Sequence, residues 1–237
     1  MNRTSFVRII CIAYAGIIAL GAYAAIQDIT LKRKAKAGDQ QQFKVSAVFT
    51  TEQGDITFNQ NRTEKVTAVK PDGGYVVEAS STDTKVVVAG MDMPSPDTKD
   101  SSEIGPDGLV QTITSEMPVD ASSYRIANLQ AFKVPDAAVK IGDEIKFEIP
   151  ADKKKETPPV KAVYTVVGME KVKDWDTVKL TFTAEETEGL TKSSAKGTIW
   201  VSVVDGSMVK SEATWKDVQP TGVPFPLNGK FIIERVK

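Results

Sequence analysis

Apolar and polar residues alternate over many short segments of this chain, as they do along strands that bury one face. In 160–167 and 177–183 the alternation is combined with β-branched and aromatic residues, which strands favour, and 173–176 between them predicts a turn. The same pattern predicts further strands at 29–36, 42–51, 55–70, 75–80, 85–89, 109–115, 198–204, 208–215 and 231–236. Taken together, the segments predict an antiparallel all-β protein.

Two segments depart from the strand pattern. Residues 121–132 are the one place for a short, minor helix, although the spacing of their apolar residues leaves helix and strand both open. Residues 91–107 are polar, contain Pro94 and Pro96 and have no apolar period. They therefore predict a flexible loop.

The dipeptide Asp205-Gly206 separates two of the predicted strands, 198–204 and 208–215. In a two-residue type I′ turn both central residues adopt a positive φ, which Asp and Gly tolerate better than most residues. The sequence therefore predicts a tight hairpin at this position.

Two ten-residue stretches of the chain are similar: KAGDQQQFKV at 36–45 and KIGDEIKFEI at 140–149. Gly-Asp at this place favours a turn that starts a strand, because Gly tolerates positive φ and Asp can bond to its own backbone. A phosphate site would instead need a glycine-rich loop that leads into a helix. The shared spacing predicts two duplicated β units, 25–133 and 134–237; the alternative, that such turns recur by chance in a β protein, stays open.

The N-terminus has the features of a secretory signal peptide. Arg3 and Arg8 precede an uncharged apolar run at 9–26, and Ala22-Tyr23-Ala24 supplies the small residues that signal peptidase needs. We expect cleavage after Ala24, so that 1–24 is removed and the protein is exported to the periplasm or the extracellular space. The alternative is a single-pass membrane anchor, and it is disfavoured by the basic residues that follow at 32–36.

Composition excludes several classes of function. The net charge is −1, so no positive field points to nucleic acid. The chain has no His, and its single Cys, Cys11, lies inside the N-terminal apolar run. The mature protein would therefore have no disulfide, no thiol nucleophile and no thiolate metal site, and an exported chain of this length without disulfides is typical of a bacterial envelope.

No catalytic, cofactor or metal site is expected. Ser193 and Lys196 match the S-x-x-K pattern of penicillin-binding enzymes, but the partner motifs are missing and strands flank the segment. The acidic residues of 91–107 do not have EF-hand spacing, so a solvated loop is favoured over a calcium site. Carboxylate pairs for a hydrolase cannot be assigned from sequence spacing.

The large apolar side chains of the chain have two interpretations. Aromatic residues in strands are commonly core residues. Some could instead line a cavity in a curved sheet, together with methionines on a flexible lid, because Met adapts to irregular apolar ligands. The candidate ligand-lining residues are Met91, Met93, Tyr164, Phe182, Trp200 and Trp215.

Residues 134–143, VPDAAVKIGD, fit a P-x-x-x-V-K-x-G-D motif that resembles uncharacterised exported bacterial β-rich proteins. The strand succession that follows, with Gly197-Thr198-Ile199-Trp200 and the Asp-Gly hairpin, is similar to the LolA/LolB-like lipoprotein-carrier superfamily. The resemblance covers roughly 134–218 and implies an antiparallel curved sheet, or half-barrel, that shelters a lipid-like ligand. It implies no specific functional residue.

The expected function is therefore that of an exported, non-catalytic β protein without a cofactor, which binds a hydrophobic or lipid-like ligand or an envelope protein partner. A membrane would be a partner only if the N-terminal segment stays uncleaved. Two alternatives remain: a structural or scaffold protein of the cell envelope without a small-molecule ligand, and a hydrolase that uses carboxylates.

Overall fold

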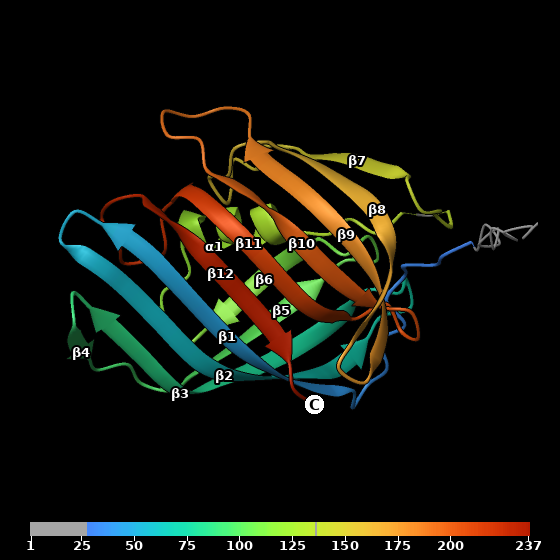
Figure 1. Cartoon of the computed structure of the whole chain (residues 1–237), viewed down its shortest axis with the longest axis horizontal. Coiled ribbons are helices and arrows are strands. Elements are labelled where there is room, and N and C mark those ends of the chain that lie inside the picture. Colours follow the sequence, from blue (N-terminus) through green and yellow to red (C-terminus); the bar gives the residue numbers. More distant parts are fainter. Residues whose placement is uncertain (1–27, 136) are drawn as a thin grey trace, which may run out of the picture.

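The computed structural model describes residues 28–135 and 137–237 (Figure 1). The predicted signal peptide, with Cys11, lies outside the described residues. In the part that is described, no helix is long and apolar enough to cross a membrane. The elements are β1 (Gln40–Thr51), β2 (Gly54–Val69), β3 (Tyr75–Val88), β4 (Met91–Met93), β5 (Thr98–Ile104), β6 (Val110–Ser115), α1 (Ala121–Gln130), β7 (Glu144–Ile149), β8 (Val160–Val172), β9 (Trp175–Glu186), β10 (Ser194–Ser202), β11 (Met208–Val218) and β12 (Leu227–Arg235).

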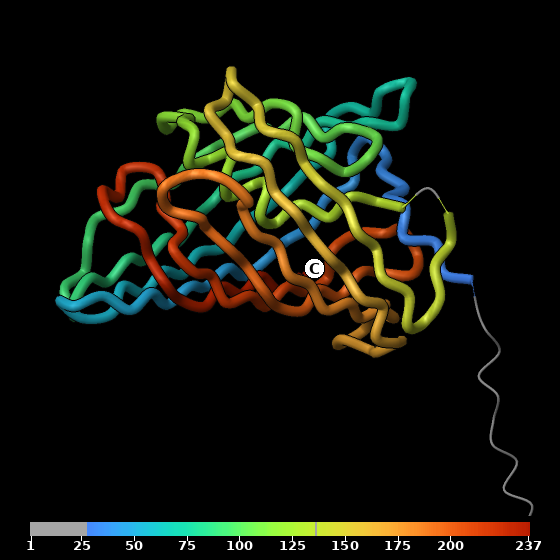
Figure 2. Tube along the Cα trace, turned by 90° about the horizontal axis from the view of Figure 1, so that it is seen from above, coloured from blue at the N-terminus to red at the C-terminus, as the bar shows by residue number. Residues whose placement is uncertain are grey.

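All strands belong to one antiparallel 12-stranded sheet with the order β6-β5-β3-β2-β1-β12-β11-β10-β9-β8-β7, and β4 pairs with β3 beside this path. The sheet stays open, because β6 and β7 are its two edges. It curves, and the segment that holds α1 lies on its inner side (Figure 2). The expectation of an all-β protein with a minor helix and an antiparallel curved sheet, or half-barrel, is confirmed.

Strands from both predicted units form this single sheet. β1–β6 and α1 come from 25–133, and β7–β12 come from 134–237. The two sets meet where β1 pairs with β12, from Phe43 opposite Arg235 to Thr50 opposite Asn228. Their inner faces therefore form one continuous concave surface.

The two Gly-Asp turns have the same hydrogen bonds. Gly38, with a φ of 94°, donates its N–H to the carbonyl of Val66, and the Asp39 carboxylate accepts from the N–H of Lys36. Gly142, with a φ of 95°, donates to Val166 in the same way. The Asp143 carboxylate likewise accepts from the N–H of Lys140. Each turn is a structural device that starts a strand, which agrees with the interpretation of the sequence; internal duplication stays a prediction.

The prediction of a loop over 91–107 is wrong for much of that segment, which forms β4 and β5. Thr98–Ile104 has the polar sequence TKDSSEI, yet it lies between β3 and β6 and forms ladder hydrogen bonds on both sides. Ion pairs from Asp100 to Arg62 and from Glu103 to Lys70 attach it further. Sheet context therefore overrides a low intrinsic strand propensity.

Two other local predictions also need correction. Residues 29–36 form no strand: Ile29 makes an isolated bridge to Val139, and Lys34 donates to the Asp205 carbonyl in the β10–β11 loop. This segment, the N-terminal strap, crosses the end of the sheet instead of following a strand. Asp205-Gly206 does not form a type I′ turn, because only Gly206 has a positive φ and the loop between Ser202 and Ser207 is longer than two residues.

Helix α1 is attached to both arms of the curved sheet. The N–H of Ile113 in β6 donates to the Tyr124 hydroxyl at 3.2 Å, and Arg125 forms an ion pair with Glu186 in β9. Leu129 is almost fully buried against the core. The helix therefore contacts β6 on one arm of the open sheet and β8–β10 on the other, and so bridges the two arms.

Asp120 is the N-cap of α1 and links it to the loop before β12. Its carboxylate accepts hydrogen bonds from the Ser123 N–H at 3.1 Å and from the Thr221 hydroxyl at 2.7 Å. Desolvation opposes the shift, but these hydrogen bonds together hold the pKa of Asp120 below its ordinary value. The carboxylate form is therefore favoured in the folded protein.

We expect Asp120→Ala to lower the free energy of unfolding by about 1 kcal/mol at neutral pH, the usual cost of losing an N-cap. Because the folded pKa is lowered, the contribution of the charge is present above the unfolded pKa and is lost as pH falls through the folded pKa. Asp120→Asn keeps a capping oxygen and is the control, with a smaller loss. Urea unfolding from neutral to acidic pH measures the free energy of unfolding of both variants. If the difference in this free energy between wild type and Asp120→Asn does not narrow toward acidic pH, the stabilising role of the Asp120 charge is contradicted.

Candidate functional site

The concave face encloses a cavity of about 510 Å³ between the sheet, α1 and the segments beside it. Strands β1–β3, β5, β6 and β8–β12 all contribute to its wall. Gly105, Pro106 and Gly108 from the β5–β6 loop line another part of it, as do Ala131 and Phe132 after the helix. The cavity is thus a product of the curvature of the sheet and of the helix that spans it.

The wall from β8–β12 is mainly apolar. The strand register places Tyr164, Phe182, Gly197, Ala213 and Phe231 in one row across five neighbouring strands. The cavity is lined by Tyr164, Phe182, Ala213 and Phe231 of this row and by Ile199, Val201, Met208 and Ile233. This part of the cavity suits a hydrocarbon chain or ring.

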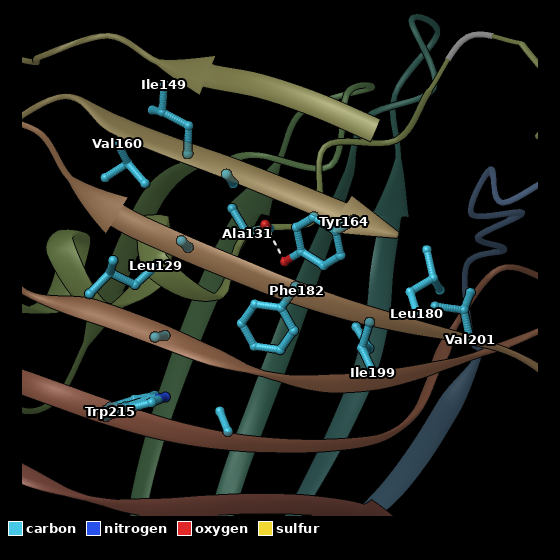
Figure 3. Packing of buried hydrophobic residues seen from close by; sticks show 14 of the residues in the cluster. Leu129, Ala131, Ile149, Val160, Tyr164, Leu180, Phe182, Ile199, Val201 and Trp215 are labelled. Carbon is cyan, nitrogen blue, oxygen red and sulfur yellow. Dashed lines mark hydrogen bonds between the residues drawn. The ribbon is translucent and has the colours of Figure 1, made fainter. Parts of the chain in front are cut away.

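Tyr164 fixes the segment that follows α1. Its hydroxyl donates to the Ala131 carbonyl at 2.9 Å, which Figure 3 shows, and its ring stacks on Phe182 with centroids 5.2 Å apart. Burial raises the pKa of Tyr164, so the phenol stays neutral. The aromatic base of the cavity is therefore rigid and uncharged.

The wall from β1 and β2 contains a polar patch. Facing inward on β2, Ile56 and Phe58 are followed by Gln60, Arg62 and Glu64. Gln41 on β1 lies opposite Glu64, and together with Gln60, Arg62 and Glu64 it forms what we call the polar wall.

Arg62 is the centre of the polar wall. Its Nη1 and Nη2 donate to the two carboxylate oxygens of Asp100 at 2.9 Å, and its Nε donates to Glu64 at 2.8 Å. Burial alone would lower the pKa of Arg62, but the two carboxylates raise it above its ordinary value. The guanidinium is therefore permanently charged and already paired.

A second arginine, Arg33, lines the cavity where the N-terminal strap crosses the end of the sheet. Its Nη1 donates to the Asp205 carboxylate at 2.8 Å, and Nη2 lies 3.6 Å from the Asp39 carboxylate. Arg235 lies near this group and donates to the Ser207 hydroxyl at 3.1 Å. Both cavity-lining arginines are thus held by two carboxylates each.

The six residues predicted to line a ligand site lie in four places. Tyr164 and Phe182 line the cavity. Trp215 is buried in the adjoining core, where it stacks on Phe231 with centroids 4.7 Å apart. Trp200 lies between the cavity-lining Ile199 and Val201 and so faces the opposite side of the sheet, where Lys179 and Lys210 cover its ring. Met91 and Met93 are exposed on β4 and are not among the residues of the cavity wall.

The other candidate chemistries have structural partners. Ser193 is buried and donates to the Asp217 carbonyl at 2.7 Å, whereas Lys196 is exposed on β10. Asp107 accepts from the N–H of Leu109 within its own loop. Across residues 28–135 and 137–237, no group of three or more His, Cys, Asp or Glu side chains is placed to hold a metal ion.

The polar wall was not predicted, although the sequence contains a signal for it. In the alternating segment 55–70, Ile56, Phe58 and Val66 define the inward phase, and Gln60, Arg62 and Glu64 fall on that same phase. Polar residues in an inward phase indicate a lined cavity or a buried polar network, because unpaired polar groups are costly in a core.

No family model matches this sequence, and no curated protein matches it. Among solved structures, the chain is similar to "a putative lipoprotein from Parabacteroides distasonis ATCC 8503". The identity is 13%, the match covers 89% of this chain and 100% of that chain, and the TM-score is 0.34.

Proposed function

We propose that this protein is an exported, non-catalytic protein of the bacterial envelope that binds a hydrophobic or lipid-like ligand in its concave cavity. The observation that carries the proposal is the cavity itself, about 510 Å³ with an apolar wall built by five strands. Small-molecule sites commonly have volumes of about 300–1,000 Å³ and mainly apolar linings with a few polar groups. The signal-peptide pattern at 1–24 supports export.

The non-catalytic part of the proposal is supported by how the two arginines and the buried tyrosine of the cavity are used. Arg33 and Arg62 are each paired with two carboxylates, and the buried phenol of Tyr164 donates to a backbone carbonyl. A general acid or base needs freedom to exchange a proton with a substrate. These groups instead stabilise the wall of a binding site.

Ser211→Phe tests the proposed site, because Ser211 lines the cavity between Ile199 and Ile233 in the strand register. A phenyl ring at this place occupies space that a ligand would use, so we expect the affinity for the neutral apolar dye Nile red to fall at least about tenfold. The matched control is Thr214→Phe, which places the same ring on the exposed, opposite face of β11 and should leave dye binding unchanged.

Two results would contradict the proposal. One is wild-type protein, stripped of lipid by organic extraction and refolded, that takes up no Nile red. The other is equal binding by Ser211→Phe and Thr214→Phe. Export has its own readout: the intact mass of protein from the envelope fraction should correspond to a chain that begins at Ala25, and a full-length mass would contradict cleavage.

A further inference from the structure

The charges of the cavity wall limit the chemical class of the ligand. This inference rests on the proposed function. The cavity is lined by two cationic side chains, Arg33 and Arg62, and by two anionic ones, Asp39 and Glu64. No lysine is among the residues that line it in the described part of the chain. The sign of the field inside the cavity therefore depends on how these few groups are paired.

Both arginines are neutralised by carboxylates that lie in or behind the wall. Asp100 binds Arg62 with both oxygens, and Glu64 binds the Nε of the same guanidinium. Asp205 and Asp39 hold Arg33 in a similar way. Even with Arg235 included, three guanidiniums face four carboxylates, so negative charge is in excess.

Glu64 has a carboxylate oxygen to spare. Its Oε1 accepts from Arg62, whereas Oε2 makes no hydrogen bond with any residue of the described chain. Gln41 and Gln60, its neighbours on the polar wall, likewise use no side-chain hydrogen bond within 28–135 and 137–237. The polar wall therefore offers a free anionic acceptor and two uncommitted amides.

The apolar wall lies on the other side of the cavity, on β8–β12. A ligand that satisfies both walls must have an apolar body and a polar group at one end. An anionic polar group would meet no unpaired guanidinium among the cavity-lining residues of the described chain and would lie beside Glu64, whereas a cationic group would gain a charge-assisted hydrogen bond there.

We propose that the ligand is a cationic amphiphile, with a primary amine or similar ammonium group bound by Glu64 and the glutamines of the polar wall, and with its hydrocarbon part on the row of Tyr164 and Phe182. This assignment separates the site from one built for fatty acids or phosphate esters, which would require free arginines or lysines in the wall.

Three probes with the same chain test the assignment: decylamine, decanol and decanoate, each used at neutral pH to displace Nile red from the wild-type protein. We expect decylamine to bind most tightly, decanol less tightly and decanoate least, with about tenfold or more between the amine and the carboxylate. Glu64→Gln should weaken decylamine about tenfold and leave decanol nearly unchanged. Glu78→Gln, on the opposite face of β3, is the matched control and should alter none of the three.

A second variant keeps the Arg62–Glu64 pair intact in case its loss disturbs the sheet. Gln60→Lys adds a positive charge to the polar wall and should weaken decylamine while strengthening decanoate. Decanoate that binds the wild type as well as decylamine, or Glu64→Gln that leaves the order of the probes unchanged, overturns the cationic assignment but leaves ligand uptake standing. Failure of all three probes, decanol included, overturns the proposed function as well.

Discussion

Arg125→Met is expected to lower the free energy of unfolding by about 3–5 kcal/mol, the cost of leaving a buried charge without its partner. The Glu186 side chain is fully buried, and Arg125 binds its two oxygens at 2.7 and 2.6 Å. After the substitution, the N–H of Ser193 at 2.8 Å is the hydrogen-bond donor that remains to the carboxylate among the described residues. The helix that closes the cavity would lose its main attachment to β9 at the same time.

Two further variants separate the cost of an unpaired charge from the worth of the pair. The double variant Arg125→Met/Glu186→Met removes both charges and should recover most of the loss, because apolar replacements of buried pairs are often nearly neutral. Lys161→Met breaks the exposed pair with Glu148 and should change stability by less than about 0.5 kcal/mol. Urea unfolding measures all three, and a double variant no more stable than Arg125→Met would refute the account.

Gly229→Ala is expected to lower the free energy of unfolding by about 3 kcal/mol, at the upper end of what overpacking usually costs. Gly229 lies on β12 between Phe49 of β1 and Trp215 of β11, and the rings of these neighbours lie 6.4 Å apart. A Cβ at this position would be 2.1 Å from the Val48 carbonyl oxygen and 2.7 Å from a ring carbon of Phe49. The first of these contacts is with a backbone atom, so no change of rotamer relieves it, and β1 and β12 must move apart.

The control for Gly229 is another strand glycine that has room for a side chain. At Gly168 on β8, an added Cβ would have no heavy atom within 4 Å, and the φ is not positive. Gly168→Ala should therefore change the free energy of unfolding by less than about 1 kcal/mol in either direction. Gly197→Ala, with a Cβ 1.9 Å from the Glu212 carbonyl oxygen, should behave like Gly229→Ala. Equal unfolding free energies for Gly168→Ala and Gly229→Ala would show that the sheet accommodates the methyl group.

Strand positions could be predicted where one face is apolar and the other polar. β8 and β9, for example, begin at or within two residues of their predicted starts, because their alternation is regular. The sequence does not determine which side chains of β10 point to the inner face, because Ile199, Trp200 and Val201 are all apolar and both faces of the strand look buried. That ambiguity explains why the sequence predicts Trp200 as a ligand-lining residue although it faces away from the cavity.

β5 and the site itself depend on contacts that are distant in the sequence. The polar segment Thr98–Ile104 becomes a strand because β3 and β6 lie on either side of it, and sequence alternation contains no information about that neighbourhood. The cavity needs α1 to span the two arms through Tyr124 and Arg125. The alternation within β2 alone shows that Gln60, Arg62 and Glu64 point to the inner face. That this face lines a cavity follows only from the curvature of the sheet around them.

The pairing of β1 with β12 has a consequence for how the chain folds. Every other pair of neighbours along the sheet joins strands that are close in the sequence, whereas this pair joins the two ends of the described chain. Local hairpins form quickly, and contacts of high sequence separation form late because the intervening chain must first be ordered. The entropic cost of the topology is therefore concentrated in one ladder, and a chain with new ends between α1 and β7 and its old ends joined would follow its sheet from edge to edge in simple succession.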